Sequence, residues 1–549
     1  MQDINLTKIW KEQEEKMAQK LAELTNLPYI NLNYSFIPQE VLNIIDPKDA
    51  EEYKLVIFWL DSNKLKIGVL DPKNEKTLSF IEDLKKRGYE TEIFIISQGS
   101  FKKVIEDYNK IKNQKTKTIN VSVIHIENSL IEKIKNDIKD LKDLDELISK
   151  YNTPKLAFDI LEVIIGAILI FHPSDVHFEP QKEFVDIRFR IDGLLHKVGK
   201  ISFSSYQIVK NRLKILSRMK ITFRKLSQDG RFTLSLPTKE LEVRSSVIPG
   251  DYDETFVLRI LDPETVKLQL ENLGFREDQL IIIKKNLIQP NGMILTTGPT
   301  GSGKTTTLYS FIHKINSPNI KIITIEDPIE YKMPGIQQTQ VNPKEGYTFA
   351  SGLRAILRQD PDVILVGEIR DEETANIAVN AALTGHLVIS TLHTNDSVGT
   401  ILRLLNLKVR KELIPPALRL VIAQRLVRRI CSCAKKEKDK EKENKIKEIL
   451  KDLPSNILEN YDLDNIFFPI PQGCNICNYI GYKGRIGLYE MFEMDRDLSE
   501  IIIKEPLEQV IYEYLKMKGF VNLIQDGILK VIKNITSLEE LERVLGFIL

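Results

Sequence analysis

The glycine-rich run Gly298-Pro-Thr-Gly-Ser-Gly-Lys-Thr305 restricts the fold more than any other part of the sequence. It follows a strand-like segment that begins at Met293, and it precedes a helix-like segment, Thr305–Ile315. A strand, a glycine-rich loop and a helix in this order form a phosphate-binding loop, in which backbone N–H groups and the positive end of the helix surround a phosphate. The run therefore predicts an α/β domain that binds a nucleoside triphosphate.

The residues of this loop have separate expected tasks. The glycines let the backbone close around the β-phosphate, Lys304 reaches the β- and γ-phosphates, and the Thr305 hydroxyl binds Mg²⁺. The residues expected to bind the nucleotide are Gly298, Pro299, Thr300, Gly301, Ser302, Gly303, Lys304, Thr305 and Thr306.

Two apolar segments end in carboxylates, which a nucleotide hydrolase needs beside its phosphate loop. Val363–Glu368 is a buried-strand pattern whose last residue, Glu368, is expected to orient the metal. A second strand pattern ends in Glu326 and Asp327, because Pro328 stops it. We expect one of these two carboxylates, with Glu326 as the first candidate, to orient or deprotonate the attacking water. A plain surface turn is the alternative for this second segment.

The composition fits a soluble globular chain of several domains. Its 549 residues exceed the roughly 100–200 residues of one domain, and its 42% hydrophobic residues exclude a disordered class. The net charge of +1 carries no signature of a nucleic-acid binder. The longest apolar run, Val163–Phe171, is about half of the ~20 residues that a membrane-spanning helix needs. Because the N-terminus also lacks the apolar core of a signal peptide, we expect a cytoplasmic protein.

Hydrophobic patterning divides the chain into six segments. Alternation at 53–60 and 64–70 predicts a hairpin, and 270–405 alternates strands with helices, as in a parallel sheet. A helix is expected over 127–148, a solvated loop or exposed helix over the mixed-charge run 435–447, and helices beyond 495. The segments are 1–110, an N-terminal domain; 111–151, a linker and helix; 152–262, an α+β domain; 263–427, the ATPase core; 428–495, a subdomain with the cysteines; and 496–549, C-terminal helices.

The four cysteines form two pairs, Cys431/Cys433 and Cys474/Cys477. Two thiolate pairs in a cytosolic chain predict a structural zinc site, because four soft ligands complete a tetrahedral shell. The first pair is one residue shorter than the usual CxxC spacing, and free structural thiols are the alternative. We expect such a site to join a helix end at Cys431 to a loop at Cys474, across a charged insert with little apolar surface of its own.

Several motifs resemble those of the secretion and pilus-assembly ATPases of type II secretion and type IV pilus systems. The segments GPTGSGKTTTLYS, 324–331, 353–371 and 384–397 look like the Walker A motif, aspartate box, Walker B motif and histidine box of that family. Outside this core, the resemblance extends to SDVHFEP, RFRIDG, QDGR, IAQRLVRRIC and GYKGRIGLYEMF. The likeness covers about 150–549 strongly and 20–110 weakly. The tetracysteine insert and long N-terminal extension resemble the assembly-motor branch.

This resemblance implies a hexameric RecA-like motor with ATP between the phosphate-loop domain and the domain before it. Arg244 and Arg259 would then supply positive charge to the γ-phosphate, and pairing with local carboxylates is the alternative reading of both. His393, with His386, corresponds to the histidine box. Further arginine candidates are Arg354, Arg358 and Arg370. Gly367 stands where a generic phosphate-loop enzyme has Asp, as in this family.

The implied function is a cytoplasmic ATPase that powers assembly of pilin or pseudopilin subunits at the inner membrane. Its implied partners are further copies of itself in a hexamer, an inner-membrane platform protein, and a docking protein at the N-terminal domain, with only peripheral membrane association and no nucleic acid. Residues 1–110 lack the Arg-Leu-Gly triplet with which some assembly motors bind cyclic di-GMP. Two alternatives are a DNA-translocating RecA-like ATPase and a nucleotide-gated structural subunit with little turnover.

Overall fold

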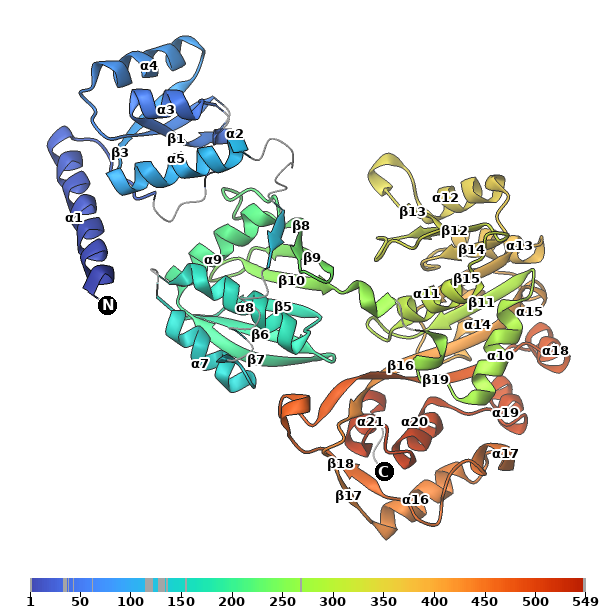
Figure 1. Ribbon diagram of the computed structural model, residues 1–549. Coiled ribbons are helices and arrows are strands. Elements are labelled where there is room, and N and C mark those ends of the chain that lie inside the picture. Colours follow the sequence, from blue (N-terminus) through green and yellow to red (C-terminus); the bar gives the residue numbers. More distant parts are fainter. Residues whose placement is uncertain are drawn as a thin grey trace. The chain divides into compact units, whose positions relative to one another are not determined.

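The protein is described here by a computed structural model, which covers residues 2–32, 37, 39–42, 44–61, 63–113, 122–126, 134, 137–153, 156–266 and 269–546. The chain divides into two compact units, Met1–Val123 and Ile124–Leu549 (Figure 1). Part of the expected linker and most of 127–136 in the expected helix lie outside the described residues.

The first unit is a small three-stranded sheet with helices. Strands β1 and β2 are antiparallel, as the expected hairpin requires, and β3 joins β2 in parallel through the crossover helix α4. The Asn74 side chain caps α4 by accepting hydrogen bonds from the N–H groups of Lys76 and Thr77. The elements are α1 (Gln2–Thr25), α2 (Gln39–Leu42), α3 (Pro47–Tyr53), β1 (Leu55–Asp61), β2 (Lys64–Val69), α4 (Glu75–Lys86), β3 (Glu90–Ile95) and α5 (Gln98–Asn113).

The second unit begins with a seven-stranded sheet in the order β4-β8-β9-β10-β5-β6-β7. Helices α7, α8 and α9 supply buried residues to its core. Helix α8 contains the long apolar run, which is explained by its burial in that core. Among the described residues, no helix is long and apolar enough to cross a bilayer. The elements are β4 (Val123–His125), α7 (Leu141–Tyr151), α8 (Ala157–Phe171), β5 (Asp175–Pro180), β6 (Val185–Ile191), β7 (Leu194–Ile201), α9 (Phe203–Leu216), β8 (Gln228–Ser235), β9 (Glu240–Ile248) and β10 (Thr255–Leu261).

The two faces of this sheet differ in chemistry, because alternate residues of a strand point to opposite faces. On β6, Val185, Ile187, Phe189 and Ile191 are buried, while the residues between them are only partly buried. The same alternation on β5, β9 and β10 leaves a second face that carries Asp175, His177, Arg188, Arg190, Arg244 and Arg259.

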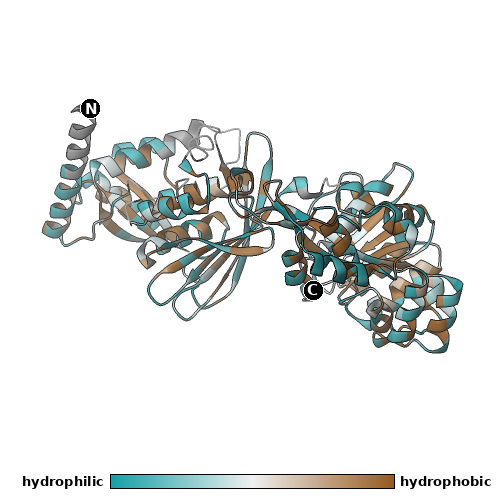
Figure 2. Cartoon of the chain, turned by 90° about the horizontal axis from the view of Figure 1, so that it is seen from below, coloured by the Kyte–Doolittle hydropathy of each residue, from teal (hydrophilic) through white to brown (hydrophobic). Residues whose placement is uncertain are grey.

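A second seven-stranded sheet, β13-β12-β14-β15-β11-β16-β19, forms the nucleotide-binding core. All its neighbours are parallel except β16 and β19, so the expected α/β parallel-sheet fold is confirmed. Its central strands are fully buried because helices cover both faces: α10 and α11 pack on one, and α12 to α15 with α18 and α19 on the other. Figure 2 shows hydrophobic residues gathered on interior strands and hydrophilic residues along the outer sides of helices.

The elements of this core follow one another as strand, crossover and strand. They are α10 (Glu277–Leu287), β11 (Gly292–Thr297), α11 (Lys304–Ile315), β12 (Ile322–Glu326), β13 (Gln337–Gln340), α12 (Phe349–Ile356), β14 (Val363–Val366), α13 (Glu372–Leu383), β15 (Leu387–Leu392), α14 (Gly399–Asn406), α15 (Ile414–Ala417), β16 (Leu418–Ile430) and β19 (Tyr482–Glu493). Short 3₁₀ turns occur at Pro263–Val266, Leu270–Asn272, Pro343–Glu345, Leu357–Gln359 and Asn475–Cys477.

The segment between β16 and β19 differs from expectation in two ways. Cys431 follows a long strand, not a helix, because β16 continues in antiparallel pairing with β19. The charged insert also has an apolar core, since Ile446, Leu450 and Phe468 pack in one cluster with residues of α20. Its elements and those after it are β17 (Lys435–Glu437), α16 (Lys440–Leu450), α17 (Ser455–Leu458), β18 (Phe468–Ile470), α18 (Arg496–Lys504), α19 (Glu508–Met517), α20 (Leu523–Ile532) and α21 (Leu538–Leu545).

Candidate active site

The glycine-rich loop joins β11 to α11 and packs tightly against β16. Gly298 has φ 147° and Gly303 has φ 88°, backbone conformations that favour glycine. A Cβ on Gly298 would lie 2.5 Å from the Gln424 carbonyl oxygen, and one on Gly303 would lie 2.8 Å from Gln424 Nε2. The glycines are therefore required both by the turn and by its closeness to the neighbouring strand.

Gln424 lies within the segment IAQRLVRRIC, whose sequence alone gives this residue no expected task. Its side-chain oxygen accepts a hydrogen bond of 2.8 Å from Thr307 Oγ1 in the first turns of α11. The Gln424 side chain thus joins the start of α11 to β16, and its backbone carbonyl lies close to Gly298. The segment's place beside the loop depends on strand order, which its sequence does not reveal.

Lys304 lies at the start of α11 and folds back over the loop. Its Nζ donates hydrogen bonds to the carbonyl oxygens of Gly298 at 2.7 Å and Pro299 at 3.1 Å. Burial lowers the pKa of Lys304 to about 8, and the negative charge of Glu368 opposes that shift. The ammonium group is therefore held by neutral carbonyls, which it can release in order to bind a phosphate.

Glu368 follows β14 at the carboxyl end of the parallel sheet. Its side chain is 12% exposed and lies 2.5 Å from Arg370 NH2 and 3.3 Å from His393 Nε2, which follows β15. Gly367 keeps this strand end close to β12, since a Cβ there would lie 3.3 Å from the Ile325 carbonyl oxygen. Strand order thus brings Glu368 and His393 together from separate motifs.

Glu326 ends β12 and is buried, whereas the adjacent Asp327 is exposed. Its carboxylate accepts hydrogen bonds from the hydroxyls of Tyr309 and Thr324 and, at 3.2 Å, from Gln338 Nε2. Burial and the Glu326 charge both raise the pKa of Tyr309 above its usual range. This hydroxyl therefore remains a donor that fixes the carboxylate, a role that the sequence pattern did not indicate.

Arg244 and Arg259 are cross-strand partners on β9 and β10. Arg244 lies 2.8 Å from Glu330 Oε2 through NH1 and donates to the Ile329 carbonyl oxygen through NH2. Arg259 donates from Nε to Asp175 at 3.0 Å, and its side chain is 64% exposed. Both arginines therefore have local carboxylate partners.

A cleft of about 640 Å³ brings most of these groups together, but Arg244, Gly298 and Pro299 do not line it. Loop residues 300–306 line it with Glu326, Asp327, Glu368, Arg370 and His393, and the preceding sheet contributes Arg259. Apolar side chains such as Ile168, Leu241 and Leu261 lie along the same cleft. A cavity of this size with one polar end and one apolar wall suits a nucleotide.

The remaining candidates lie elsewhere. His386 precedes β15, at the opposite end of that strand from His393, and its Nδ1 is 3.1 Å from the Ala381 carbonyl oxygen. Arg354 pairs with Glu373, and Arg358 is exposed on a 3₁₀ turn. None of these three residues lines the cleft.

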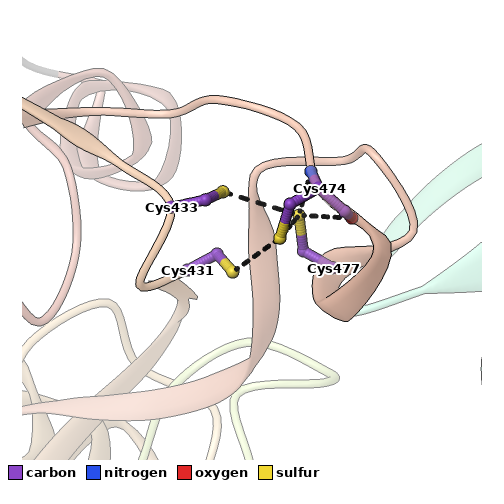
Figure 3. A group of neighbouring side chains, drawn as sticks. All are labelled: Cys431, Cys433, Cys474 and Cys477. Atoms are coloured by element: carbon purple, nitrogen blue, oxygen red, sulfur yellow. Dashed lines mark hydrogen bonds between the residues drawn. The ribbon is translucent and has the colours of Figure 1, made fainter.

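The four cysteines form a separate cluster (Figure 3). Cys431 and Cys433 follow β16, and they face Cys474 and Cys477 at a 3₁₀ turn. Sγ–Sγ distances are 3.8 Å for Cys431–Cys474, 3.9 Å for Cys433–Cys477 and 3.7 Å for Cys474–Cys477. Thiolates about 2.3 Å from a tetrahedral metal are about 3.8 Å apart, so the cluster suits a metal ion despite the short CxC spacing.

Comparisons with known proteins place this site in a family. Residues 154–543 match the family described as "Type II/IV secretion system protein". The chain is 36% identical over 529 residues to the "Type IV pilus assembly ATPase PilB" of Pseudomonas aeruginosa, covering 96% of this chain and 90% of that protein. It is also 36% identical over 505 residues to the "Type II secretion system ATPase E" of Vibrio cholerae, covering 90% and 95%.

A solved structure shares the fold at lower identity. The ATPase DotB of Legionella pneumophila superimposes with a TM-score of 0.52 and 21% identity, over 70% of this chain and 95% of that one. The resemblance seen in the motifs is thus confirmed over most of the sequence. The chain therefore belongs to the family of type II secretion and type IV pilus assembly ATPases.

Proposed function

We propose that this chain hydrolyses ATP and uses the energy to assemble pilin or pseudopilin subunits. The observation that carries the proposal is the single cleft in which the phosphate loop, two strand-end carboxylates and Arg259 converge. The named relatives, which are ATPases of pilus assembly and type II secretion, support the same activity and give its biological direction.

The phosphate loop binds the nucleotide through residues Gly298 to Thr306. Lys304 moves from the loop carbonyls to the β- and γ-phosphates, and the helix N-terminus adds its partial positive charge. The exposed Thr305 hydroxyl and the Glu368 carboxylate are oxygen ligands of the kind that Mg²⁺ prefers, so they fit that ion. When bound, Mg²⁺ neutralises phosphate charge as the terminal phosphate is transferred to water.

Two carboxylates divide the remaining work. Glu326, held by Tyr309 and Thr324, orients the attacking water and accepts its proton. Glu368 is held by Arg370 and His393. Because His393 reaches Glu368 from the next strand of the sheet, it links the state of the nucleotide to the segment that follows β15.

Arg244 and Arg259 supply positive charge to the γ-phosphate. Arg259 already lines the cleft, whereas Arg244 must leave Glu330 and the Ile329 carbonyl to reach the nucleotide. A guanidinium neutralises charge that develops on the transferred phosphoryl oxygens, and this is the rate-enhancing role of an arginine finger.

The cysteine cluster holds a structural zinc ion. Four thiolates satisfy zinc fully and leave no open position, so this ion supports the fold and takes no part in catalysis.

The assembly is a homo-hexamer on the cytoplasmic face of the inner membrane. It acts on a membrane platform protein of a pilus, secretion or competence machine, and the domain before residue 110 docks a further protein partner. Its membrane association is peripheral, through these partners. The relatives from type IV pilus assembly and type II secretion, at equal identity, support the first two of these machines.

The test is the ATPase rate of the purified full chain with Mg²⁺, with and without DNA. Wild type should hydrolyse ATP at a rate that DNA leaves unchanged. Lys304→Ala should lose nucleotide binding, and Glu368→Gln should bind ATP while hydrolysis falls at least tenfold. Glu372→Gln is the matched control, because this exposed carboxylate on α13 pairs only with Lys408 among the described residues.

Two outcomes would overturn the proposal in different directions. Stimulation by DNA would favour a DNA-translocating motor. Tight ATP binding with negligible turnover in wild type would favour a nucleotide-gated structural subunit.

A further inference from the structure

A buried carboxylate stands behind the arginine that lines the ATP cleft. Asp175 is the first residue of β5 and lies directly opposite Arg259 on β10 and opposite Arg190 on β6. Directly opposed residues of an antiparallel sheet share one face, so the three side chains form a row, with the acid in the middle.

Both oxygens of this carboxylate are engaged. Oδ1 accepts a hydrogen bond from Arg259 Nε at 3.0 Å, while Oδ2 lies 3.5 Å from Arg190 Nε and accepts from Ser174 Oγ at 2.9 Å. The Asp175 side chain is 8% exposed, against 64% for Arg259. A carboxylate fixed on two sides and shielded from water has one orientation, and it imposes that orientation on its partner.

Arg259 binds Asp175 through Nε and not through its terminal amino groups. A guanidinium has five N–H donors, and Arg259 spends only the Nε–H on Asp175. Asp175 is its one ion-pair partner among the residues that the structure describes. The two terminal amino groups, which bind phosphate in a fork geometry, are left for the cleft that Arg259 lines.

Arg244 shows the opposite arrangement. Its NH1 and NH2 groups are the ones that contact Glu330 and the Ile329 carbonyl oxygen. The terminal amino groups of Arg244 are thus occupied, whereas those of Arg259 are presented. Glu242 lies 3.8 Å from Arg244 Nε, which is beyond hydrogen-bond distance, so the acid that binds Arg244 meets its terminal amino groups, whereas the acid that binds Arg259 meets Nε.

We propose that Asp175 is a positioning residue of the ATP site, which anchors Arg259 through Nε and so directs its two terminal amino groups to the terminal phosphates. Asp175 does not line the cleft, so it acts through the arginine and not on the nucleotide. This inference rests on the proposed function, in which Arg259 binds the γ-phosphate. It identifies the group that orders this arginine before ATP arrives, which lowers the conformational cost of catalysis.

The experiment is a double-mutant cycle in the full chain, with kcat and KM for ATP and, as a second readout, the Kd for ADP. Asp175→Ala should lower kcat about tenfold and leave the Kd for ADP within about twofold, because ADP lacks the γ-phosphate. Arg259→Ala should lower kcat by the same factor. The kcat of the double variant should be no lower than that of Arg259→Ala alone. Asp175→Asn keeps an acceptor oxygen for Nε, so its kcat should stay within about threefold of wild type.

Asp186→Ala is the matched control. Asp186 lies on β6, on the same sheet face, pairs with Lys197 at 2.5 Å and does not line the cleft. Its loss removes a comparable ion pair without touching Arg259, and kcat should not change. If Asp175→Ala does not fold, as judged by thermal unfolding, Asp175→Ser replaces it in the cycle, because serine is also too short to reach Nε.

The possible outcomes distinguish a failure of the positioning role of Asp175 from a failure of the proposed role of Arg259. Wild-type turnover in Arg259→Ala would refute the role of that arginine in catalysis. A loss in Arg259→Ala without a loss in Asp175→Ala would refute only the positioning role. Multiplied losses in the double variant, or an Asp175→Asn variant as slow as Asp175→Ala, would refute it as well.

Discussion

At the scale of single residues, the protonation of Lys304 links nucleotide binding to pH. Burial lowers its pKa to about 8, whereas a bound phosphate stabilises the charged form and raises that pKa. Binding should therefore take up a proton above pH 8 and none well below it. Between pH 7 and pH 9 the Kd for ADP should rise about tenfold, because the charged fraction of Lys304 falls by that factor.

Isothermal titration calorimetry in two buffers of different ionisation enthalpy measures both effects. Lys304→Arg is the control, since a guanidinium stays charged throughout this range and its Kd should not depend on pH. A Kd in wild type that is the same at pH 7 and pH 9 would contradict the prediction.

The sequence did not predict which side chains contact the candidate site residues. The phosphate loop, Glu368 and Glu326 could be proposed from the sequence because each lies in a local pattern of strand, turn and charge. Asp175, Tyr309 and Gln424 act on residues 84, 17 and 117 positions away in the chain. Such contacts follow from strand order and register, which no local pattern encodes.

At the scale of secondary-structure elements, strand pairing also explains why the expected helix end at Cys431 was wrong. The residues before Cys431 were expected to end a helix there. They form a strand because β19 pairs along almost the whole length of β16, from Leu420 to Ile430. Tertiary pairing outweighs local preference when both partners are long.

The cysteine cluster gives a prediction for metal removal. A structural zinc site contributes on the order of 10 kcal/mol, so protein purified without chelator should hold about one zinc per chain. Removal of the metal should increase hydrogen exchange around Cys431–Ala434 and Cys474–Gly481. Helix α16 should stay protected, because Ile446 and Leu450 pack in an apolar core.

Elemental analysis and exchange mass spectrometry test this directly, with Cys433→Ser as the variant that removes one ligand. ADP binding should be unaffected in both preparations, because the cluster does not line the cleft. A zinc content well below half an ion per chain would contradict the prediction and would mean that the cysteines are free thiols.

Helix α20 gives a second prediction at this scale. Asp526 is fully buried on α20, where it contacts Lys530, Arg276 at 2.6 Å and the N–H of Tyr489 at 2.9 Å. Burial lowers the pKa of Lys530, and Asp526 opposes that shift. Asp526→Ala should therefore leave the buried Lys530 without a carboxylate partner, while Arg276 keeps Asp278 at 2.9 Å, and it should lower the opening free energy of α20 by about 3–5 kcal/mol.

Native-state hydrogen exchange across α20 and β19 measures this loss. The matched control is Asp497→Ala, since Asp497 is 65% exposed and pairs with Lys518 at 3.4 Å. An exposed pair of this kind contributes about 1 kcal/mol or less. Equal effects of the two variants would mean that the buried network adds nothing to the attachment of α20.

At the scale of the whole molecule, the division into two units separates nucleotide chemistry from the N-terminal domain. The first unit has its own core around β1, β2 and β3. Every residue that lines the ATP cleft lies between Ile168 and Arg485, within the second unit. Strand β4 belongs to the sheet of the second unit, so the functional boundary falls before Val123.

A fragment that begins at Ser122 should therefore fold and bind ADP with a Kd within about twofold of the full chain, because independent cores keep their own stability. Circular dichroism establishes folding, and a fluorescent ADP titration measures binding, with Lys304→Ala in the same fragment as the inactive control. A folded fragment whose Kd for ADP has risen more than tenfold would show that the first unit contributes to the site. ADP binding would then depend on residues of the first unit, although none of them lines the cleft.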